Sequence, residues 1–427
     1  MIKLRTRNIF VPGGQPEYTY VARDEHGLEA ELRSASDNLC KLVAVTGPTK
    51  SGKSVLTKRV YPKSDAVWID GGSVKSEDDL WSQVVDQLSG ATATATTTEH
   101  TGTTTGSAEG AGEIGVPFLT KASGRVTASH AHAKRVGSVT SREVTLRAAA
   151  LRQLEASKKP LVIDDFHYLS PELQGAIVRA VKALVFAGHP VVLLAIPHRR
   201  YDAVRVEREM TGRVHQIGIP AWTISELRTI PSVGLPLLNA TIDDSVLALF
   251  LNESLGSPHL VQEFFREYCI KGGVEETRPM KAPITAAASP QDLLTAIAAN
   301  LSRPVFDALA RGPRERTKRL SRAFRDGRSG DIYFAVLNAI AVKKPGVGRL
   351  EYSEIRDALN ELLQKLPQAH EISRVLEHMA TIRADQEASA PVLDWDKEHR
   401  RLHITDPYFA FFLRWGGDVF LEGHHKA

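Results

Sequence analysis

The sequence predicts an α/β fold, with a parallel sheet in the first half of the chain, then a helical region, then a C-terminal winged-helix domain. Three observations predict it. Short β-branched runs alternate with helical patterns from about residue 41 to residue 219, the strands stop after Ile219, and the chain closes with three helices and a hairpin. Strands that alternate with helices form parallel sheets covered on both faces. Three helices before a hairpin are the order of a winged helix.

The totals indicate a globular protein with more than one domain. A chain of 427 residues exceeds one ordinary core and predicts two or three domains. Apolar residues make up 42% and charged residues 24%, so a core can be buried. A net charge of +4 does not by itself imply a nucleic-acid partner. Two cysteines, no apolar leader and no run of about 18 apolar residues predict a soluble cytoplasmic protein with no membrane partner.

Strands and helices are expected to alternate through the first half. The expected strands are Lys41–Thr46, Ala66–Asp70, Leu161–Ile163, Val191–Ile196 and Val214–Ile219. The expected helices are Lys53–Val60, Ser76–Leu88, Glu143–Ser157 and Pro171–Ala187. Ser76 with Asp79 offers a capping box, and Pro171 suits the first turn of its helix. Residues 91–140 are rich in Thr, Gly and Ala with few large apolar residues, and predict a surface insertion.

Changes of pattern predict the domain boundaries. An α/β core over 1–222 is followed by a helical lid over 223–275, a linker and basic helical segment over 276–330, and a winged-helix-like domain over 331–427. The elements expected in this last domain are the helices Ile332–Val342, Ser353–Leu366 and Glu371–Ala384 and the strands Val392–Trp395 and Arg401–Ile404. Tyr408–Trp415 predicts an apolar packing helix, with its aromatic side chains in the core.

The segment GPTKSGKS fits the phosphate-loop pattern G-x-x-x-x-G-K-[ST], follows an apolar strand and opens a helix. Its glycines let the backbone curl around phosphate oxygens, and the N–H groups supply positive potential. Lys53 can reach the β- and γ-phosphates, and the Ser54 hydroxyl can ligate Mg²⁺. The sequence therefore predicts that ATP and Mg²⁺ bind here. The residues expected to bind nucleotide are Gly47, Pro48, Thr49, Lys50, Ser51, Gly52, Lys53 and Ser54.

A second motif, LVIDDFHYLS, is an apolar strand that ends in two carboxylates. Asp164 at the strand's end is placed to hold Mg²⁺ with Ser54, and Asp165 is placed to polarise the attacking water. Asp165 and Lys53 are thus candidate catalytic residues. Fast ATPases usually have glutamate at the position of Asp165, so slow hydrolysis is expected, and a scaffold that barely hydrolyses ATP stays open.

These motifs resemble those of STAND ATPases, the signalling branch close to AAA+ proteins, over about Tyr20 to Tyr268. The resemblance implies a P-loop NTPase sheet closed by a helical lid. It also implies that Arg23 lies near the base or the phosphates of the nucleotide, although Ala22 stands where the family has glycine. Pro258, in LGSPHLVQEF, would lie against the adenine.

The same resemblance implies roles for further basic residues. Arg199 would contact the γ-phosphate from the end of the sensor-1 strand, with Arg200 as the alternative. His259 stands where AAA+ motors carry a sensor-2 arginine, which favours a switch over a motor. Arg213 precedes the last strand, where an arginine can act on a neighbouring subunit; a salt bridge or solvation is favoured.

Nucleic-acid binding is considered but not favoured. A basic run can track phosphates, and it consists of Arg311, Arg314, Arg316, Lys318, Arg319, Arg322, Arg325 and Arg328, with Lys397, Arg400 and Arg401 in the wing. The third helix of the winged-helix domain, however, carries Glu371 and Glu377, with Asp385 close by. Such acidic residues are unusual in a helix that contacts DNA bases. A regulatory or partner-docking role is therefore preferred.

The function predicted is a nucleotide-dependent switch with slow ATP hydrolysis that signals to a separate protein effector. The resemblance adds an expectation of bacterial stress or antiviral defence, and a homo-oligomer stays open. The alternative is a DNA-binding AAA+ loader or initiator that assembles on duplex. The sequence does not identify the trigger or the effector.

Overall fold

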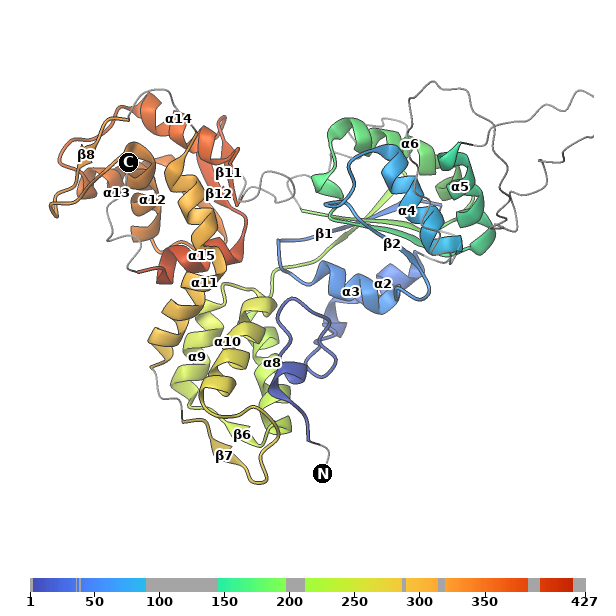
Figure 1. Cartoon of the computed structure of the whole chain (residues 1–427), viewed down its shortest axis with the longest axis horizontal. Helices are drawn as coiled ribbons and strands as arrows, with labels where there is room; N and C mark the ends of the chain where they lie inside the picture. Colours follow the sequence, from blue (N-terminus) through green and yellow to red (C-terminus); the bar gives the residue numbers. More distant parts are fainter. Residues whose placement is uncertain are drawn as a thin grey trace, which may run out of the picture.

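The computed structural model describes residues 3–35, 37, 40–89, 145–196, 212–285, 289–313, 319–382 and 392–417. Five strands form one parallel sheet in the order β2–β3–β4–β1–β5 (Figure 1). They are β1 Leu42–Thr46, β2 Val67–Asp70, β3 Leu161–Asp164, β4 Val191–Ala195 and β5 Val214–Gly218. Each expected strand is confirmed, with differences of a single residue at the ends. The expected insertion at 91–140 lies outside the described residues.

Both faces of the sheet are covered by helices, as the β-branched strands predict. Along β3, Val162 packs on one face while Leu161 and Ile163 pack on the other, because successive side chains in a strand point to opposite sides. One face is covered by α2 Leu28–Ser34 and α3 Lys53–Val60. The other is covered by α4 Glu77–Ser89, α5 Leu146–Ser157 and α6 Pro171–Phe186, and Figure 1 shows these two groups on opposite sides of the sheet.

The helix starts follow the residues expected to cap them. The Ser76 hydroxyl accepts from the backbone N–H of Asp79 at 3.1 Å, and the Asp79 carboxylate accepts from Lys75 N–H at 3.0 Å. Pro171 occupies the first turn of α6 after Ser170, whose side chain caps it. Short 3-10 turns, η1 Asp24–His26 and η2 Phe166–Tyr168, complete the core.

After β5 the chain forms a helical lid of α8 Ile224–Leu237, α9 Asp244–Glu253 and α10 Pro258–Lys271, with the paired short strands β6 Ala240–Thr241 and β7 Ala282–Pro283. The N-terminal segment, which includes α1 Thr6–Ile9, packs against this lid. The Thr6 hydroxyl donates to Val274 O at 2.5 Å, and Phe10 stacks on Phe265 with ring centroids 5.8 Å apart. The sequence did not predict this contact, because it joins segments more than 250 residues apart.

The C-terminal elements form a winged helix with one more strand than the sequence predicted. They are α12 Ile332–Val342, β10 Gly348–Glu351, α13 Tyr352–Leu362, α14 Ala369–Met379, β11 Leu393–Asp396 and β12 Arg401–Ile404. β10 pairs with β12 to give the antiparallel order β10–β12–β11, so the expectation of a two-stranded end was wrong. Only Leu350 of β10 is buried, so this short edge strand carries no alternating apolar pattern.

A long helix, α11 Pro290–Arg311, joins the lid to the winged helix (Figure 1). Two short strands follow it, β8 Arg322–Ala323 and β9 Ser329–Gly330, and they pair with each other. The last helix, α15 Pro407–Trp415, returns to pack on α11 and the lid. Phe409, Phe411 and Phe412 are fully buried, which confirms the prediction that these aromatic side chains lie in the core. The lid, α11 and the winged helix share one hydrophobic core. No helix among the described residues has the length and apolar character needed to cross a membrane.

Candidate nucleotide-binding site

The predicted phosphate loop joins β1 to α3, at the carboxyl edge of the sheet. Gly52, the residue before α3, has φ +93°, a left-handed conformation that favours glycine. Gly47 lies so close to its neighbours that an added Cβ would stand 3.0 Å from the Ile219 Cβ and from Ser51 Oγ. The geometry of the loop therefore favours glycine at both positions, by backbone conformation at Gly52 and by close approach at Gly47.

Lys53 is the buried cation of the loop. Its ammonium donates to Gly47 O at 3.0 Å and to Pro48 O at 2.9 Å, so the side chain folds back over the loop. Burial lowers its pKa to about 8, while the nearby charges of Asp165 and Asp164 act in the opposite direction. A bound anion would raise the pKa of Lys53 again.

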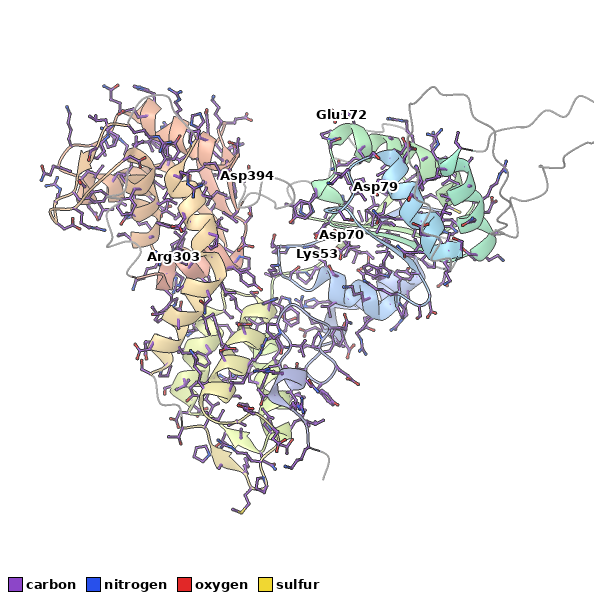
Figure 2. All side chains as sticks on the ribbon, viewed as in Figure 1. Lys53, Asp70, Asp79, Glu172, Arg303 and Asp394 are labelled. Atoms are coloured by element: carbon purple, nitrogen blue, oxygen red, sulfur yellow. The ribbon has the colours of Figure 1, made fainter. Side chains whose placement is uncertain are left out.

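The two carboxylates of the second motif lie on the same edge of the sheet as Lys53. Asp164 ends β3, and in the sheet register it stands beside Asp70, which ends β2. Figure 2 labels Lys53 and Asp70 at this edge. The backbone N–H of Asp165 donates to Asp164 Oδ1 at 3.0 Å. Burial and the neighbouring Asp164 raise the pKa of Asp165 to about 6, although Lys53 opposes this shift.

Asp165 has φ +51°, which is unusual for a residue with a side chain. Its backbone is held between a turn and a neighbouring strand. Asp165 O accepts from Tyr168 N–H at 2.9 Å. Gly71, just after β2, approaches so closely that an added Cβ would lie 2.7 Å from Asp165 O. No sequence pattern marks Gly71, because the contact joins two neighbouring strands of the sheet.

A cavity of about 350 Å³ connects these residues with the lid. Its walls come from the P-loop and α3, from the N-terminal segment between Val11 and Leu28, and from lid residues that include Trp222, Pro258 and His259. Asp165 lines it as well. Four stretches far apart in the sequence therefore meet around one space, as is usual for a ligand site between a sheet and a second domain.

The donors around this cavity suit a nucleoside triphosphate with a divalent cation. Ser51 Oγ is buried and has no hydrogen-bond partner among the described residues. Lys53 Nζ bonds only carbonyl oxygens in this part of the chain, so its charge is available to an anion. Ser54 lines the cavity, and Asp164 ends the neighbouring β3; a hydroxyl and a carboxylate are oxygen ligands that Mg²⁺ prefers.

Arg23 lines the cavity, but its guanidinium is bonded to protein groups. Arg23 Nε donates to Glu226 Oε1 at 2.5 Å, and its two Nη atoms donate to Pro220 O and Ala221 O at 3.1 and 3.2 Å. The guanidinium also lies over the Trp222 ring, 4.5 Å from its centroid. Arg23 thus ties the segment before the P-loop to the start of the lid.

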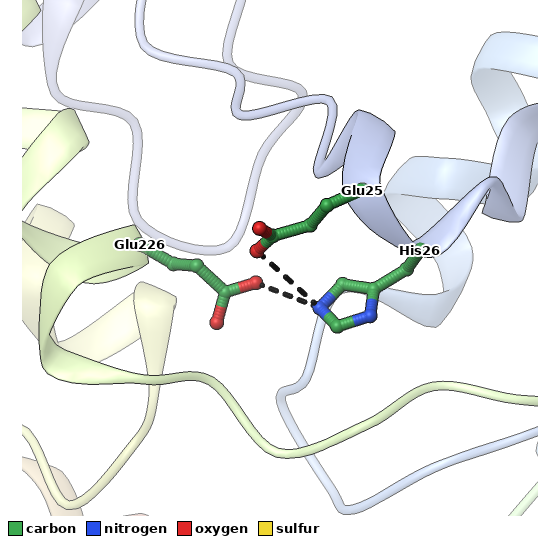
Figure 3. Close-up of side chains that lie close together, drawn as sticks. All are labelled: Glu25, His26 and Glu226. Carbon is green, nitrogen blue, oxygen red and sulfur yellow. Dashed lines mark hydrogen bonds and ion pairs between the residues drawn. The ribbon is translucent and has the colours of Figure 1, made fainter.

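Two further residues join this ion-pair network (Figure 3). His26 Nε2 lies 3.2 Å from Glu226 Oε1 and 3.7 Å from Glu25 Oε1. The same carboxylate oxygen already accepts from Arg23 Nε. A metal ion at Glu25, His26 and Glu226 would therefore face a guanidinium, so we interpret this cluster as a clasp between the core and the lid.

On the lid side, Pro258 begins α10 and lines the cavity; its contact with the adenine stays a prediction. The next residue, His259, also lines the cavity, and its Nδ1 is hydrogen-bonded to the Tyr408 hydroxyl. Burial and the nearby charge of Lys50 lower the pKa of His259 to about 4. His259 is therefore neutral at physiological pH and does not supply the charge of a sensor-2 arginine.

Tyr408, a residue of the C-terminal domain, lies at the site. From the sequence, it was expected only in a packing helix. The ammonium of Lys50 lies 5.2 Å from the centroid of its ring. Asp406, buried at the start of α15, caps this helix by accepting from the N–H groups of Tyr408 and Phe409 at 2.8 and 2.9 Å. The apolar pattern of Tyr408–Trp415 predicts packing only and carries no signal for this contact.

Three further basic residues were candidates to act on a nucleotide. Arg199 and Arg200 fall outside the described residues. Arg213 precedes β5, at the amino edge of the sheet, and its guanidinium packs 4.1 Å from the centroid of the Phe186 ring. The carboxyl edge with Lys53 is the opposite one, so Arg213 does not face the cavity of its own chain.

Several arginines of the basic run are bonded within the C-terminal domain. Arg319 pairs with Asp331 at 2.7 Å, and Arg322 pairs with Glu371 at 2.5 Å. Arg328 pairs with Asp326 at 2.7 Å. These three side chains hold the domain together instead of forming an open basic track. Arg314, Arg316 and Lys318 fall outside the described residues.

No protein-family model matches the chain, and no curated protein matches it in sequence. Among solved structures, the chain is similar to Cdc6p from Pyrobaculum aerophilum, with 12% identity, a TM-score of 0.41 and coverage of 97% of this chain and 98% of that one. It is also similar to the Orc1 protein of Aeropyrum pernix in complex with DNA, with 12% identity, a TM-score of 0.43 and coverage of 98% of each chain.

A STAND protein with a tetratricopeptide repeat sensor from Pyrococcus horikoshii is a third similar structure, with 11% identity, a TM-score of 0.35 and coverage of 94% of this chain and 43% of that one. Similarity this loose does not decide a function. The fold follows from the chain's own topology, with a phosphate loop between β1 and α3 and an acidic β3 in one parallel sheet. The chain has a P-loop NTPase fold with a helical lid and a C-terminal winged helix.

Proposed function

We propose that this protein is an ATP-dependent switch. It binds Mg·ATP between the parallel sheet and the lid, hydrolyses it slowly, and passes the nucleotide state to its C-terminal domain and to a separate protein partner. The observation that carries the proposal is the position of Tyr408. This one side chain of the C-terminal domain contacts both His259 in the lid and Lys50 in the phosphate loop.

The residues at the sheet edge account for the chemistry. Gly47 to Ser54 would cradle the phosphates, and the ammonium of Lys53 would neutralise charge on the β- and γ-phosphates. Mg²⁺, held by Ser54 and Asp164, would offset the remaining phosphate charge. Asp165 is the proposed base: its carboxylate accepts a proton from the water that attacks the γ-phosphorus as the bond to the bridging oxygen breaks. A pKa of about 6 leaves most Asp165 ionised at neutral pH.

The lid and the C-terminal domain are bound firmly enough to respond as a unit. Glu253 in α9 accepts two hydrogen bonds from Arg414 and one from the Trp415 indole, each 2.7 Å long. Phe264 in α10 packs on Phe411, with ring centroids 4.9 Å apart. A nucleotide that favours one position of the lid therefore favours one position of the winged helix. A ligand can shift such an equilibrium only by contacts that differ between the two states.

Nucleotide binding and hydrogen exchange test the proposal. Wild-type protein should bind a fluorescent ATP analogue, Lys53→Ala should lose binding, and Asp165→Asn should keep it. Amide exchange of α15 should differ between the ATP-bound Asp165→Asn protein and the ADP-bound wild type. Tyr408→Leu should bind nucleotide yet lose this difference. Equal amide hydrogen exchange of α15 in all nucleotide states would refute the proposed switch.

The partner can be sought with the same variants. A pull-down from the native host with Lys53→Ala and Asp165→Asn compares a nucleotide-free state with an ATP-bound state. A protein retained by only one variant would identify the signalling state. An identical set of retained proteins would count against nucleotide-dependent signalling.

A DNA-binding loader or initiator is the second candidate, and one observation favours keeping it. The acidic residues of α14 are paired, Glu371 with Arg322 and Glu377 with Lys397, while Arg374 is exposed. The carboxylates of α14, whose negative charge disfavours contact with DNA bases, are therefore partly neutralised. Fluorescence anisotropy with duplex DNA at rising salt decides: tight ATP-dependent binding with a steep salt slope favours the loader. Absence of DNA binding at about 100 mM salt would favour the nucleotide-dependent switch over the loader.

A further inference from the structure

We propose that Trp222 is a positioning residue of the phosphate loop, through which the lid sets the direction of the Gly52 N–H group. This inference rests on the proposed nucleotide site and deepens it. Trp222 lies between β5 and α8 and lines the cavity. Its indole N–H donates to the backbone carbonyl of Ser51 at 2.9 Å. The lid thus holds the phosphate loop by a hydrogen bond to its backbone.

The geometry of the peptide bond gives this contact its consequence. In a trans peptide the C=O and the following N–H point in opposite directions. An indole that holds Ser51 O on one side therefore directs the N–H of Gly52 to the other side. Gly52 has φ +93°, and a Cβ added there would meet nothing within 4 Å. Gly52 O also accepts from Leu56 N–H at 2.9 Å, so the hydrogen bond from Trp222 and the first turn of α3 fix Gly52 from its two ends.

The indole in turn is held from the lid side. The Arg23 guanidinium lies 4.5 Å from the centroid of its ring and is itself bonded to Glu226 in the first turn of α8. Trp222 directly precedes Thr223, the N-cap of α8, which forms a capping box with Glu226. Movement of α8 would carry the indole with it and would pull on the Ser51–Gly52 peptide. The phosphate affinity of the loop then depends on the position of the lid.

Substitution of Trp222 by Phe separates this role from a packing role. Phenylalanine keeps an aromatic ring beneath Arg23 but removes the N–H donor. We expect Trp222→Phe to bind ADP about five- to tenfold more weakly, as for the loss of one neutral hydrogen bond. Adenosine lacks phosphates, so its affinity should be unchanged. Both ligands are measured by competition against a fluorescent ADP analogue.

The matched control is Trp415→Phe. The Trp415 indole also donates a hydrogen bond, to Glu253 at 2.7 Å, but it lies at the far end of α15 from Tyr408. This variant should bind ADP and adenosine as the wild type does. Intrinsic fluorescence adds a second readout, because the emission change on ADP binding should be largely lost in Trp222→Phe, which keeps four other tryptophans.

The outcomes are distinct. Unchanged ADP affinity in Trp222→Phe would overturn the inference, and so would an equal loss for ADP and adenosine, since that points to the base pocket or to folding. Failure of the wild type to bind ADP would instead refute the proposed nucleotide site itself.

Discussion

The clasp between the core and the lid offers a measurable prediction. Arg23 Nε and Glu226 Oε1 lie 2.5 Å apart, with only 3% and 7% of the two side chains exposed. Burial alone would raise the pKa of Glu226, but hydrogen bonds from Thr223 and Arg23 outweigh it and lower the pKa from 4.5 to about 2. That difference corresponds to about 3 kcal/mol in favour of the folded clasp at neutral pH. Breaking a buried ion pair typically costs about 3–5 kcal/mol, which agrees.

Glu226→Gln is the perturbation. Glutamine keeps an oxygen that can accept from Thr223 N–H, so the change removes chiefly the charge opposite Arg23. Amide hydrogen exchange of α8 is the assay, because it reports local opening without assuming that the whole chain unfolds at once. Because the Thr223 hydrogen bonds contribute to the pKa shift and glutamine can keep one of them, about 3 kcal/mol is the upper limit of the loss, and exchange at pH 7 should be faster by up to about a hundredfold.

The pH dependence of α8 protection gives an independent test of the ionised Glu226. A carboxylate whose pKa is depressed on folding stabilises above its unfolded value and loses this contribution as the pH falls. In the wild type the protection of α8 should therefore decline from about pH 4.5 towards pH 2. Glu226→Gln should lack this decline.

The exposed pair of Lys397 with Glu377 is the control, with side chains 80% and 38% exposed at 2.9 Å. Glu377→Gln should change the opening free energy of α14 by less than about 1 kcal/mol. If Glu226→Gln alters α8 no more than this control alters α14, the reasoning about the buried clasp is refuted.

Three predictions concern catalysis. Asp165→Asn should bind ATP but release phosphate at least about a hundredfold more slowly, because the base is lost. Rates of phosphate release equal to wild type would exclude Asp165 as the base. The profile of kcat/KM for ATP should be bell-shaped, falling below about pH 6 as Asp165 protonates and above about pH 8 as Lys53 loses its proton; a flat profile from pH 5 to 9 would contradict this assignment. Gly71→Ala should lower turnover more than ADP affinity, because its Cβ would lie 2.7 Å from Asp165 O. Gly72→Ala is the matched control, since its Cβ would meet side-chain atoms alone, Asp70 Oδ1 at 3.3 Å and the Tyr168 ring at 3.4 Å, and no backbone atom of Asp165; equal turnover in the two variants would argue against Gly71.

Local chemistry made part of this protein predictable. The phosphate loop and the acidic end of β3 were found from the sequence because each is a short contiguous pattern with a direct physical cause. Glycine is needed where the backbone turns left-handed, as at Gly52, and a strand buried on both faces is continuously apolar. The strands of the core were predictable for the same reason, whereas β10, with one buried residue, was not.

The site as a whole was decided by tertiary structure. Trp222 and Tyr408 belong to a lid linker and to a C-terminal packing helix, and neither has a sequence pattern that marks a ligand site. Arg23 was expected near the nucleotide and lines the cavity, but only the folded chain shows that its guanidinium is bonded to Glu226 and two backbone carbonyls. Contacts of this kind join residues hundreds of positions apart. Sequence periodicity reports which face of an element is buried, but which distant element covers that face depends on how the whole chain packs.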